Sequence, residues 1–208
     1  MEVGSIVVFE TKKLGEIAKI NTGLVVKRKQ AKFTEKALAN YKMLTLKSFE
    51  YEGCLNIEEL DYFYSIEKLD DKYLTCKGDV IIRLSYPNKS IAINKDNEGI
   101  LIPSLFAVIR LWDNAVLPEY LSIYLNSDEM KEFYAKTAIG SAIQIIKTSL
   151  LKDIIVKIPK IEIQQKTIEL YTLMLKEKAL LDELMEEKVK YNKAVLRRLI
   201  AGGINNGN

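Results

Sequence analysis

The chain has 208 residues and a formal net charge of +3, with 48% hydrophobic and 28% charged residues. This length allows one ordinary domain plus an extension, and the composition is typical of a globular protein. Histidine is absent, which excludes His-dependent catalytic triads and most zinc sites. Glycine-rich phosphate-binding loops are absent as well, and the small net charge permits nucleic-acid binding without indicating it.

Three features of the sequence bear on cellular location. The first residues lack the basic and apolar regions of a secretory signal, and no apolar run is long enough to span a bilayer. The two cysteines, Cys54 and Cys76, stand in no metal-binding or redox spacing, as expected for scattered thiols in a reducing compartment. We therefore expect a cytoplasmic protein.

The first half of the chain predicts mostly strands. Residues 14–20 predict one helical turn that leads into a strand ending at Gly23, and residues 41–107 contain short β-branched or aromatic runs between turn residues. The predicted strands of the second region are 43–46, 62–66, 80–84, 90–93 and 105–109. Strands at this spacing indicate a curled, mostly antiparallel sheet or a partial barrel.

Helical patterns return further along the chain. Pro118 suits the first position of a helix, where its missing N–H costs nothing, and Ser127 can cap a second helix that extends to about Thr137. Residues 139–146 predict a small-residue loop followed by an apolar strand, and residues 150–159 predict another short strand. The fold class predicted from these patterns is α+β, with a mostly antiparallel sheet, short helices and a long C-terminal coiled-coil-like helix.

Residues 24–42 form a basic segment that contains a single acid, Glu35. Its cations are Lys27, Arg28, Lys29, Lys32, Lys36 and Lys42. Taken alone, such a charge run is typical of a solvated loop or an exposed helix face. The alternative interpretation is a loop that contacts DNA phosphates, because Lys and Arg supply the sequence-independent part of DNA affinity.

The sequence after Pro159 predicts one very long helix, which continues without Pro or Gly to Ile200 and stops at Gly202-Gly203. A helix of about 38 residues spans about 57 Å, more than this domain can cover. Its apolar stripe is Leu170, Met174, Leu181, Leu184, Tyr191, Val195 and Leu199. We expect this stripe to meet another helix, from a second copy or from a partner, with Glu177 and Lys188 interrupting the heptads and favouring a defined pairing.

Five segments of the chain resemble the DNA-specificity subunit of type I restriction-modification systems in their order and spacing. They are residues 14–23 (LGEIAKINTG), 77–85 (KGDVIIRLS), 103–110 (PSLFAVIR), 118–127 (PEYLSIYLNS) and 151–159 (LKDIIVKIP) with QQK at 164–166. The chain is similar to one half of such a subunit. The resemblance implies a target recognition domain at 1–160, a spacer and dimerisation helix at 161–201 and a flexible tail at 202–208.

The resemblance also implies a function. Subunits of this family are non-catalytic, need no cofactor or metal, bind double-stranded DNA and recruit separate methyltransferase (M) and restriction (R) subunits. Because full subunits usually carry two recognition domains, the resemblance implies a half-subunit, either one that pairs with itself or a fragment. Two copies joined by antiparallel helices would read a bipartite site with inverted identical halves.

With DNA as the expected partner, three loops become candidate binding sites. Asn and Gln amides can bond adenine edges, and Lys or Arg can bond guanine, whereas a glycine lets the backbone approach a phosphate closely. The candidates are Lys27, Arg28, Lys29, Lys32, Lys36, Tyr86, Asn88, Lys89, Gly140, Ser141 and Gln144. The alternative interpretation is that these are ordinary turn residues and that the reading face lies elsewhere.

Two other functions compete with DNA recognition. The long helix could bind a partner in a non-catalytic adaptor whose β-domain is only a scaffold. A stand-alone metal-dependent nuclease is disfavoured, because the carboxylates at 58–61 and 70–71 have no metal-binding or basic partner in motif spacing.

Overall fold

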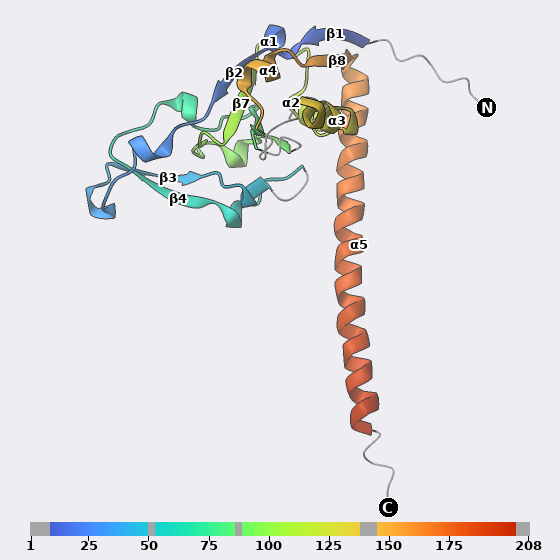
Figure 1. The fold of residues 1–208 in the computed structure, drawn as a ribbon. Coiled ribbons are helices and arrows are strands. Elements are labelled where there is room, and N and C mark those ends of the chain that lie inside the picture. Colours follow the sequence, from blue (N-terminus) through green and yellow to red (C-terminus); the bar gives the residue numbers. More distant parts are fainter. Residues whose placement is uncertain (1–8, 50–52, 86–88, 138–144, 203–208) are drawn as a thin grey trace, which may run out of the picture. The chain divides into compact units, whose positions relative to one another are not determined.

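The computed structural model describes residues 9–49, 53–85, 89–137 and 145–202 (Figure 1). The chain divides into two units, Met1–Ile168 and Glu169–Asn208. The first unit holds the described strands and short helices, and the second holds most of one long helix.

A four-stranded antiparallel sheet forms the centre of the first unit, in the order β2-β7-β5-β6. Its strands are β2 (Ala18–Thr22), β5 (Val80–Arg83), β6 (Ser90–Ala92) and β7 (Phe106–Leu111). Side chains alternate between the two faces, so Val80 and Ile82 join one buried cluster whereas Ile81 joins another. Both faces of the sheet are therefore buried, which explains the nearly continuous apolar runs in its strands.

Short helices and two further strands supply the core on the first face of this sheet. Each of the four short helices contributes to that cluster, through Leu14, Leu121, Met130 and Leu151 respectively. The last strand contributes Val156. The helices are α1 (Leu14–Ile17), α2 (Pro118–Leu125), α3 (Asp128–Thr137) and α4 (Thr148–Lys152). The strands β1 (Phe9–Lys13) and β8 (Ile155–Pro159) pair with each other in antiparallel register.

The core on the second face is built from loops and single helical turns. Phe49 and Phe106 stack there with ring centroids 4.7 Å apart, and Leu44 and Ile93 belong to the same cluster. The described 3-10 turns are η1 (Val26–Arg28), η2 (Thr34–Lys36), η3 (Lys47–Phe49), η4 (Ile57–Glu59), η5 (Asp71–Tyr73) and η6 (Lys95–Asn97).

A separate two-stranded antiparallel sheet, the β3–β4 ribbon, consists of β3 (Ala39–Met43) and β4 (Asp61–Ser65). The two strands lie side by side in Figure 1. One face of the ribbon packs on a third cluster, which includes the fully or nearly fully buried residues Leu24, Phe63 and Leu101. The ribbon is therefore fixed to the domain by a small core of its own.

The predicted α+β class is confirmed, as are the antiparallel pairing and the long helix. Pro118 stands at the first turn of α2, and α3 ends at Thr137 as predicted. The single curled sheet or partial barrel is corrected, because the strands divide into three antiparallel sheets.

Three predicted strands differ from those observed. The strand predicted at 43–46 is β3, which ends at Met43, because the Leu44 N–H leaves the ribbon to bond the Leu101 carbonyl at 3.0 Å. The predicted strand at the end of 139–146 is described only from Ile145, which forms an isolated bridge with Ser85. Within 150–159 the strand begins only at Ile155, since the preceding residues complete α4.

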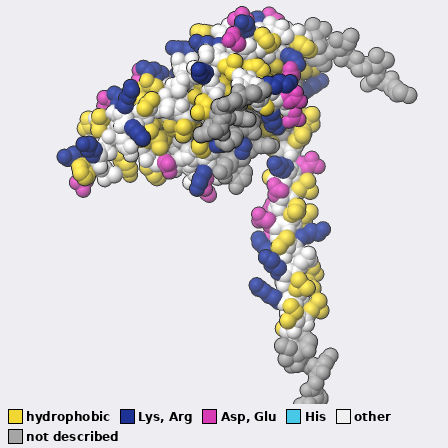
Figure 2. All heavy atoms as spheres, in the orientation of Figure 1, with side chains coloured by type: hydrophobic (Ala, Val, Ile, Leu, Met, Phe, Trp, Pro, Cys, Tyr) yellow, Lys and Arg dark blue, Asp and Glu magenta, His cyan; other side chains and the backbone are white. Residues whose placement is uncertain are grey.

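The long helix α5 covers Ile161–Gly202, a total of 42 residues. It ends one residue beyond the predicted helix, so Gly202 is corrected from tail to helix, and residues 203–208 lie outside the described part. Most stripe residues are exposed within this unit, from 54% for Leu181 to 69% for Tyr191, and Val195 is half-buried. Hydrophobic side chains can be followed along α5 in Figure 2.

A helix that crosses a membrane must be both long and apolar. Among the described residues, no helix combines the length and the apolarity needed to span a bilayer.

Candidate nucleic-acid interface

The basic loop, which we define as residues 26–36, begins at a tightly fixed point of the domain. Leu24 is buried, and its N–H donates to the Ile102 carbonyl at 2.7 Å while its carbonyl accepts from Ser104. A Cβ on Gly23 would lie 2.3 Å from the Ile102 and Pro103 oxygens, so only glycine allows this close approach. The loop thus starts from a rigid backbone.

Four of the five predicted cations of this loop are well exposed. Lys27 and Arg28 both lie in η1. Lys36 ends η2, and its ammonium lies 5.6 Å from the centroid of the exposed Phe33 ring. Lys32 is exposed between the two turns. Figure 2 shows Lys and Arg side chains beside hydrophobic ones at this end of the domain.

Lys29 differs from the other predicted cations. Its ammonium lies 2.6 Å from a carboxylate oxygen of Glu67, and it is only partly exposed. The Glu67 charge opposes that of Lys29, so a phosphate would have to compete with this carboxylate. Lys29 therefore contributes less positive charge to the surface than its place in the sequence suggests.

Backbone hydrogen bonds hold the basic loop against the ribbon. The Ala31 N–H donates to the Tyr64 carbonyl and the Ile66 N–H donates to the Lys29 carbonyl, each at 2.9 Å. An isolated antiparallel bridge joins Gln30 to Ser65. The loop therefore extends along one edge of β4, whereas β3 occupies the other edge.

The other two predicted loops are attached elsewhere. Five of the residues predicted to contact DNA lie outside the described part of the chain: Tyr86, Asn88, Gly140, Ser141 and Gln144.

The described residues that flank those two loops are joined to each other. Ser85 bridges Ile145, and the Ile146 N–H donates to the Leu84 carbonyl at 2.9 Å. Lys89 is half-buried, and its carbonyl accepts from the Arg83 N–H at 3.1 Å. The structure thus brings the ends of these loops together beyond β5, in a different sheet from the ribbon that holds the basic loop.

One exposed polar surface beside the basic loop was not among the predicted sites. The outer face of the β3–β4 ribbon carries Asn40, Lys42, Tyr62 and Tyr64. The basic segment includes Lys42, but the sequence patterns did not indicate a DNA-binding role for Asn40, Tyr62 or Tyr64. The alternation of exposed and inward residues in both strands is the signal that could have identified this face.

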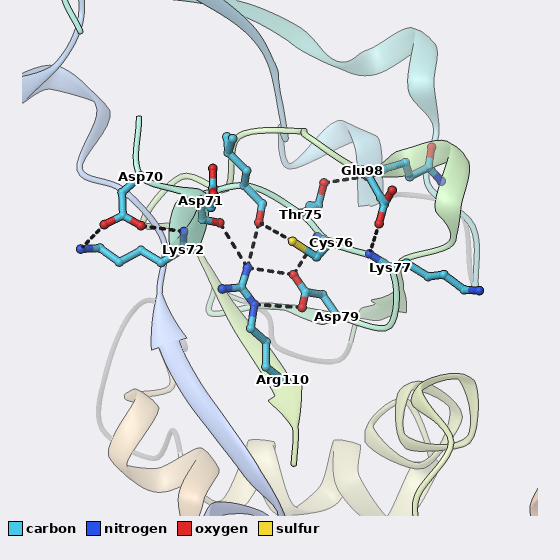
Figure 3. A network of polar contacts seen from close by, with 11 residues as sticks. Asp70, Asp71, Lys72, Thr75, Cys76, Lys77, Asp79, Glu98 and Arg110 are labelled. Atoms are coloured by element: carbon cyan, nitrogen blue, oxygen red, sulfur yellow. Dashed lines mark hydrogen bonds and ion pairs between the residues drawn. The ribbon is translucent and has the colours of Figure 1, made fainter. Parts of the chain in front are cut away.

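Among the described residues of the domain, Asp79 is the most buried charged side chain, and it forms a bidentate ion pair (Figure 3). Arg110 donates from Nε and Nη2 to the two Asp79 oxygens at 3.0 and 3.1 Å, and also from Nη2 to the Leu74 carbonyl at 2.9 Å. The Asp79 side chain is only 4% exposed, and it also accepts from the Cys76 N–H. Hydrogen bonding to Asp79 raises the pKa of Arg110.

A cavity of about 510 Å³ borders this ion pair, with the exposed Trp112 ring among its lining residues. Because Asp79 and the Leu74 carbonyl engage Nε and Nη2 of Arg110, this guanidinium holds the start of β5 and the residue after η5 to β7. We interpret the pair as a structural element of the sheet.

Local hydrogen bonds shape the two carboxylate-containing turns that were considered for a metal site. Asp70 caps η5 by accepting from the Lys72 N–H at 2.9 Å, and its pKa is lowered first by this bond and then by the Lys72 side chain. The Glu58 N–H is capped in turn by Asn56. In the described part of the chain, no group of three or more Cys, Asp or Glu residues could hold a metal ion.

A comparison with protein families matches most of the chain. Residues 7–186 match the family described as "Type I restriction modification DNA specificity domain". No curated protein matches the sequence.

Solved structures with the same fold cover nearly the whole chain. The HsdS subunit from Thermoanaerobacter tengcongensis matches 93% of it with a TM-score of 0.65 and 15% identity. The type I restriction-modification S subunit from M. genitalium matches 99% with a TM-score of 0.56 and 12% identity. A structure reported for complex assembly and conformational transition of the type I R-M system matches 96%, with a TM-score of 0.65 and 15% identity.

The chain spans about half the length of these solved structures, since it covers 49%, 49% and 50% of theirs.

Proposed function

The chain belongs to the family of type I restriction-modification DNA specificity domains, and on this premise we propose that it reads one half of a bipartite DNA target. The observation that carries the proposal is the family match over residues 7–186, which includes the recognition domain and more than half of α5. The exposed cations of the basic loop supply the phosphate contacts that such a domain needs.

The proposed subunit has no chemistry of its own and works through partners. It delivers a methyltransferase subunit and a restriction subunit to the DNA sequence that it reads, in the cytoplasm. Support for these partners comes from the family description, and one solved structure with the same fold is described in terms of complex assembly in a type I R-M system. Among the described carboxylates, Asp70 caps η5 and Asp79 pairs with Arg110, in keeping with a binding role.

We further propose that two copies pair through α5. In the second unit most of its stripe residues are exposed, and the described part of that unit holds no second helix to cover them. Burying such a stripe against another helix removes apolar surface from water.

The charge pattern of α5 favours an antiparallel pair. Four carboxylates stand together in the middle of the helix: Asp182, Glu183, Glu186 and Glu187. Cations flank them on both sides, namely Lys176 and Lys178 before them and Lys188, Lys190, Lys193, Arg197 and Arg198 after them. A parallel pair in register would align like charges, whereas an antiparallel pair places carboxylates beside cations. The antiparallel pair also holds the two recognition domains apart at opposite ends of a two-fold assembly, as the separated halves of an inverted bipartite site require.

The test is selection of bound duplexes from a randomised library, with the full chain alone and with the methyltransferase subunit added. We expect enrichment of a two-part sequence with inverted identical halves. Equal recovery of all sequences would reject the recognition role and leave an adaptor that acts through α5.

A salt series on the selected duplex separates these two functions further. DNA recognition predicts that affinity falls steeply with salt, and that charge reversal at Lys27 and Arg28 weakens binding. Binding to a protein partner through α5 should respond to neither change. The Lys27 and Arg28 side chains are exposed, so the reversed variants should fold normally.

A further inference from the structure

The outer face of the β3–β4 ribbon presents four side chains in two cross-strand pairs. Asn40 lies opposite Tyr64, and Lys42 lies opposite Tyr62. Directly opposed residues of an antiparallel pair point to the same face. Tyr62 is 68% exposed and Tyr64 is 36% exposed, and Asn40 and Lys42 are exposed beside them.

This face is held rigidly from behind. Tyr41 and Phe63 belong to the inner face, where the Leu69 N–H donates to the Tyr41 hydroxyl at 3.0 Å and Phe63 is 2% exposed. The Lys42 carbonyl accepts from the Leu101 N–H at 2.8 Å. Side chains on strands that are fixed in this way can be aimed more accurately than side chains on loops.

Exposed tyrosines alone do not identify a ligand, because aromatic residues at neighbouring positions also stabilise a two-stranded sheet. The side chains that face them are more informative. Asn can donate and accept in a bidentate bond with adenine N6 and N7, and Lys can donate to guanine O6 and N7. Donors of this kind, each opposite an aromatic ring, suit the edges of base pairs.

The surroundings of the ribbon match the charge of DNA. The basic loop lies along the outer edge of β4, with Lys27, Arg28 and Lys32 exposed. Within the ten residues of the two strands, Asp61 is the one carboxylate, and it stands at the end of β4 away from the basic loop's bridge at Ser65. If the ribbon enters a groove of a DNA duplex, the cations of the basic loop would therefore lie beside the DNA phosphates next to β4.

We propose that the outer face of the β3–β4 ribbon is a base-reading surface that enters the DNA major groove. This groove is about 12 Å wide and admits a two-stranded β-ribbon. Asn40 and Lys42 hydrogen-bond base edges, Tyr62 and Tyr64 pack against bases and the groove wall, and the basic loop binds the adjoining phosphates. The inference rests on the proposed DNA-recognition function and assigns residues to it.

The experiment measures the affinity of the full chain for the duplex selected by the wild type, and for duplexes with each base pair changed in turn. The test variants are Asn40→Ala and Lys42→Ala. The control variant is Lys32→Ala, which removes an exposed cation of the basic loop. Thermal unfolding should be nearly unchanged in all three, because the side chains are exposed.

We expect each ribbon variant to lose about 5- to 150-fold in affinity for the selected duplex and to stop discriminating at one base pair of each half-site. Its binding to unrelated duplexes should stay the same. Lys32→Ala should instead weaken all duplexes alike and reduce the salt slope by about 0.9 for each lost phosphate contact.

Three results would overturn the inference in distinguishable ways. If the wild type shows no sequence preference, the proposed function fails and the ribbon assignment fails with it. If the wild type is specific but both ribbon variants keep its preference at every base pair, only the ribbon assignment fails. If the ribbon variants weaken all duplexes alike, the ribbon contacts phosphates and does not read bases.

Discussion

At the scale of single residues, two adjacent glutamines have opposite environments. Gln164 is fully buried in the first turn of α5, within the first unit, whereas Gln165 is exposed. The Gln164 side chain accepts from the Leu117 N–H at 2.8 Å and donates to the Ala115 and Pro159 carbonyls at 2.9 Å. One amide thus links the end of β8, the start of α5 and the residues before α2.

We predict that Gln164→Ala lowers the free energy of unfolding by about 2–3 kcal/mol, because it leaves buried backbone groups without hydrogen bonds. Chemical denaturation of the full chain measures this change. Gln165→Ala is the matched control, and its effect should stay within about 0.5 kcal/mol. Equal effects of the two substitutions would show that the buried bonds contribute no net stability.

At the scale of elements, α5 and the β3–β4 ribbon each expose one face within their own unit. The ribbon directs Tyr41 and Phe63 inward, as expected for period-two alternation. The alternate residues are exposed: Asn40, Lys42, Tyr62 and Tyr64. In α5, apolar positions at spacings of three and four leave Leu181 and Leu184 more than half exposed. The two elements thus suit different partners, because the outer face of the ribbon is polar and aromatic whereas the α5 stripe is mainly aliphatic.

For α5 we predict that Leu181→Glu or Leu184→Glu abolishes self-association, since a carboxylate would have to be buried between two helices. Sedimentation equilibrium measures the mass, and circular dichroism checks that the recognition domain stays folded. Ala179→Glu, at an exposed position outside the stripe, is the matched control and should leave the dimer intact. Dimers that survive both leucine substitutions would contradict pairing through α5.

At the scale of the whole molecule, the proposed two-fold pair relates protein symmetry to DNA symmetry. Each copy contributes one recognition domain, and the chain covers about half the length of the solved S subunits. A rigid two-fold assembly can bind two inverted half-sites only when both present their grooves on the correct side of the duplex.

We therefore predict that binding depends on the gap between the half-sites with helical periodicity. Adding about five base pairs to the gap turns one half-site to the opposite side of the duplex and should abolish bivalent binding. Competition gel shifts with duplexes of increasing gap length test this. Equal affinity at every gap length would argue for two independently bound copies.

Much of this protein could be derived from its sequence, because the relevant signals are local. Pro118 and Ser127 indicate where α2 and α3 begin, and the uninterrupted pattern after Pro159 predicts α5 almost to the residue. Helix starts and apolar periods depend on residues within a few positions of each other. The same local motifs were enough to indicate the family.

Only the tertiary structure decided which polar residues form a surface. Lys29 was grouped with its basic neighbours, but it pairs with Glu67, which lies 38 positions away. Gln164 differs from Gln165 because its partner Ala115 is 49 positions away. The pairing of β3 with β4 likewise brings Asn40 beside Tyr64. Exposure and pairing depend on contacts between distant parts of the chain, and local sequence patterns do not encode those contacts.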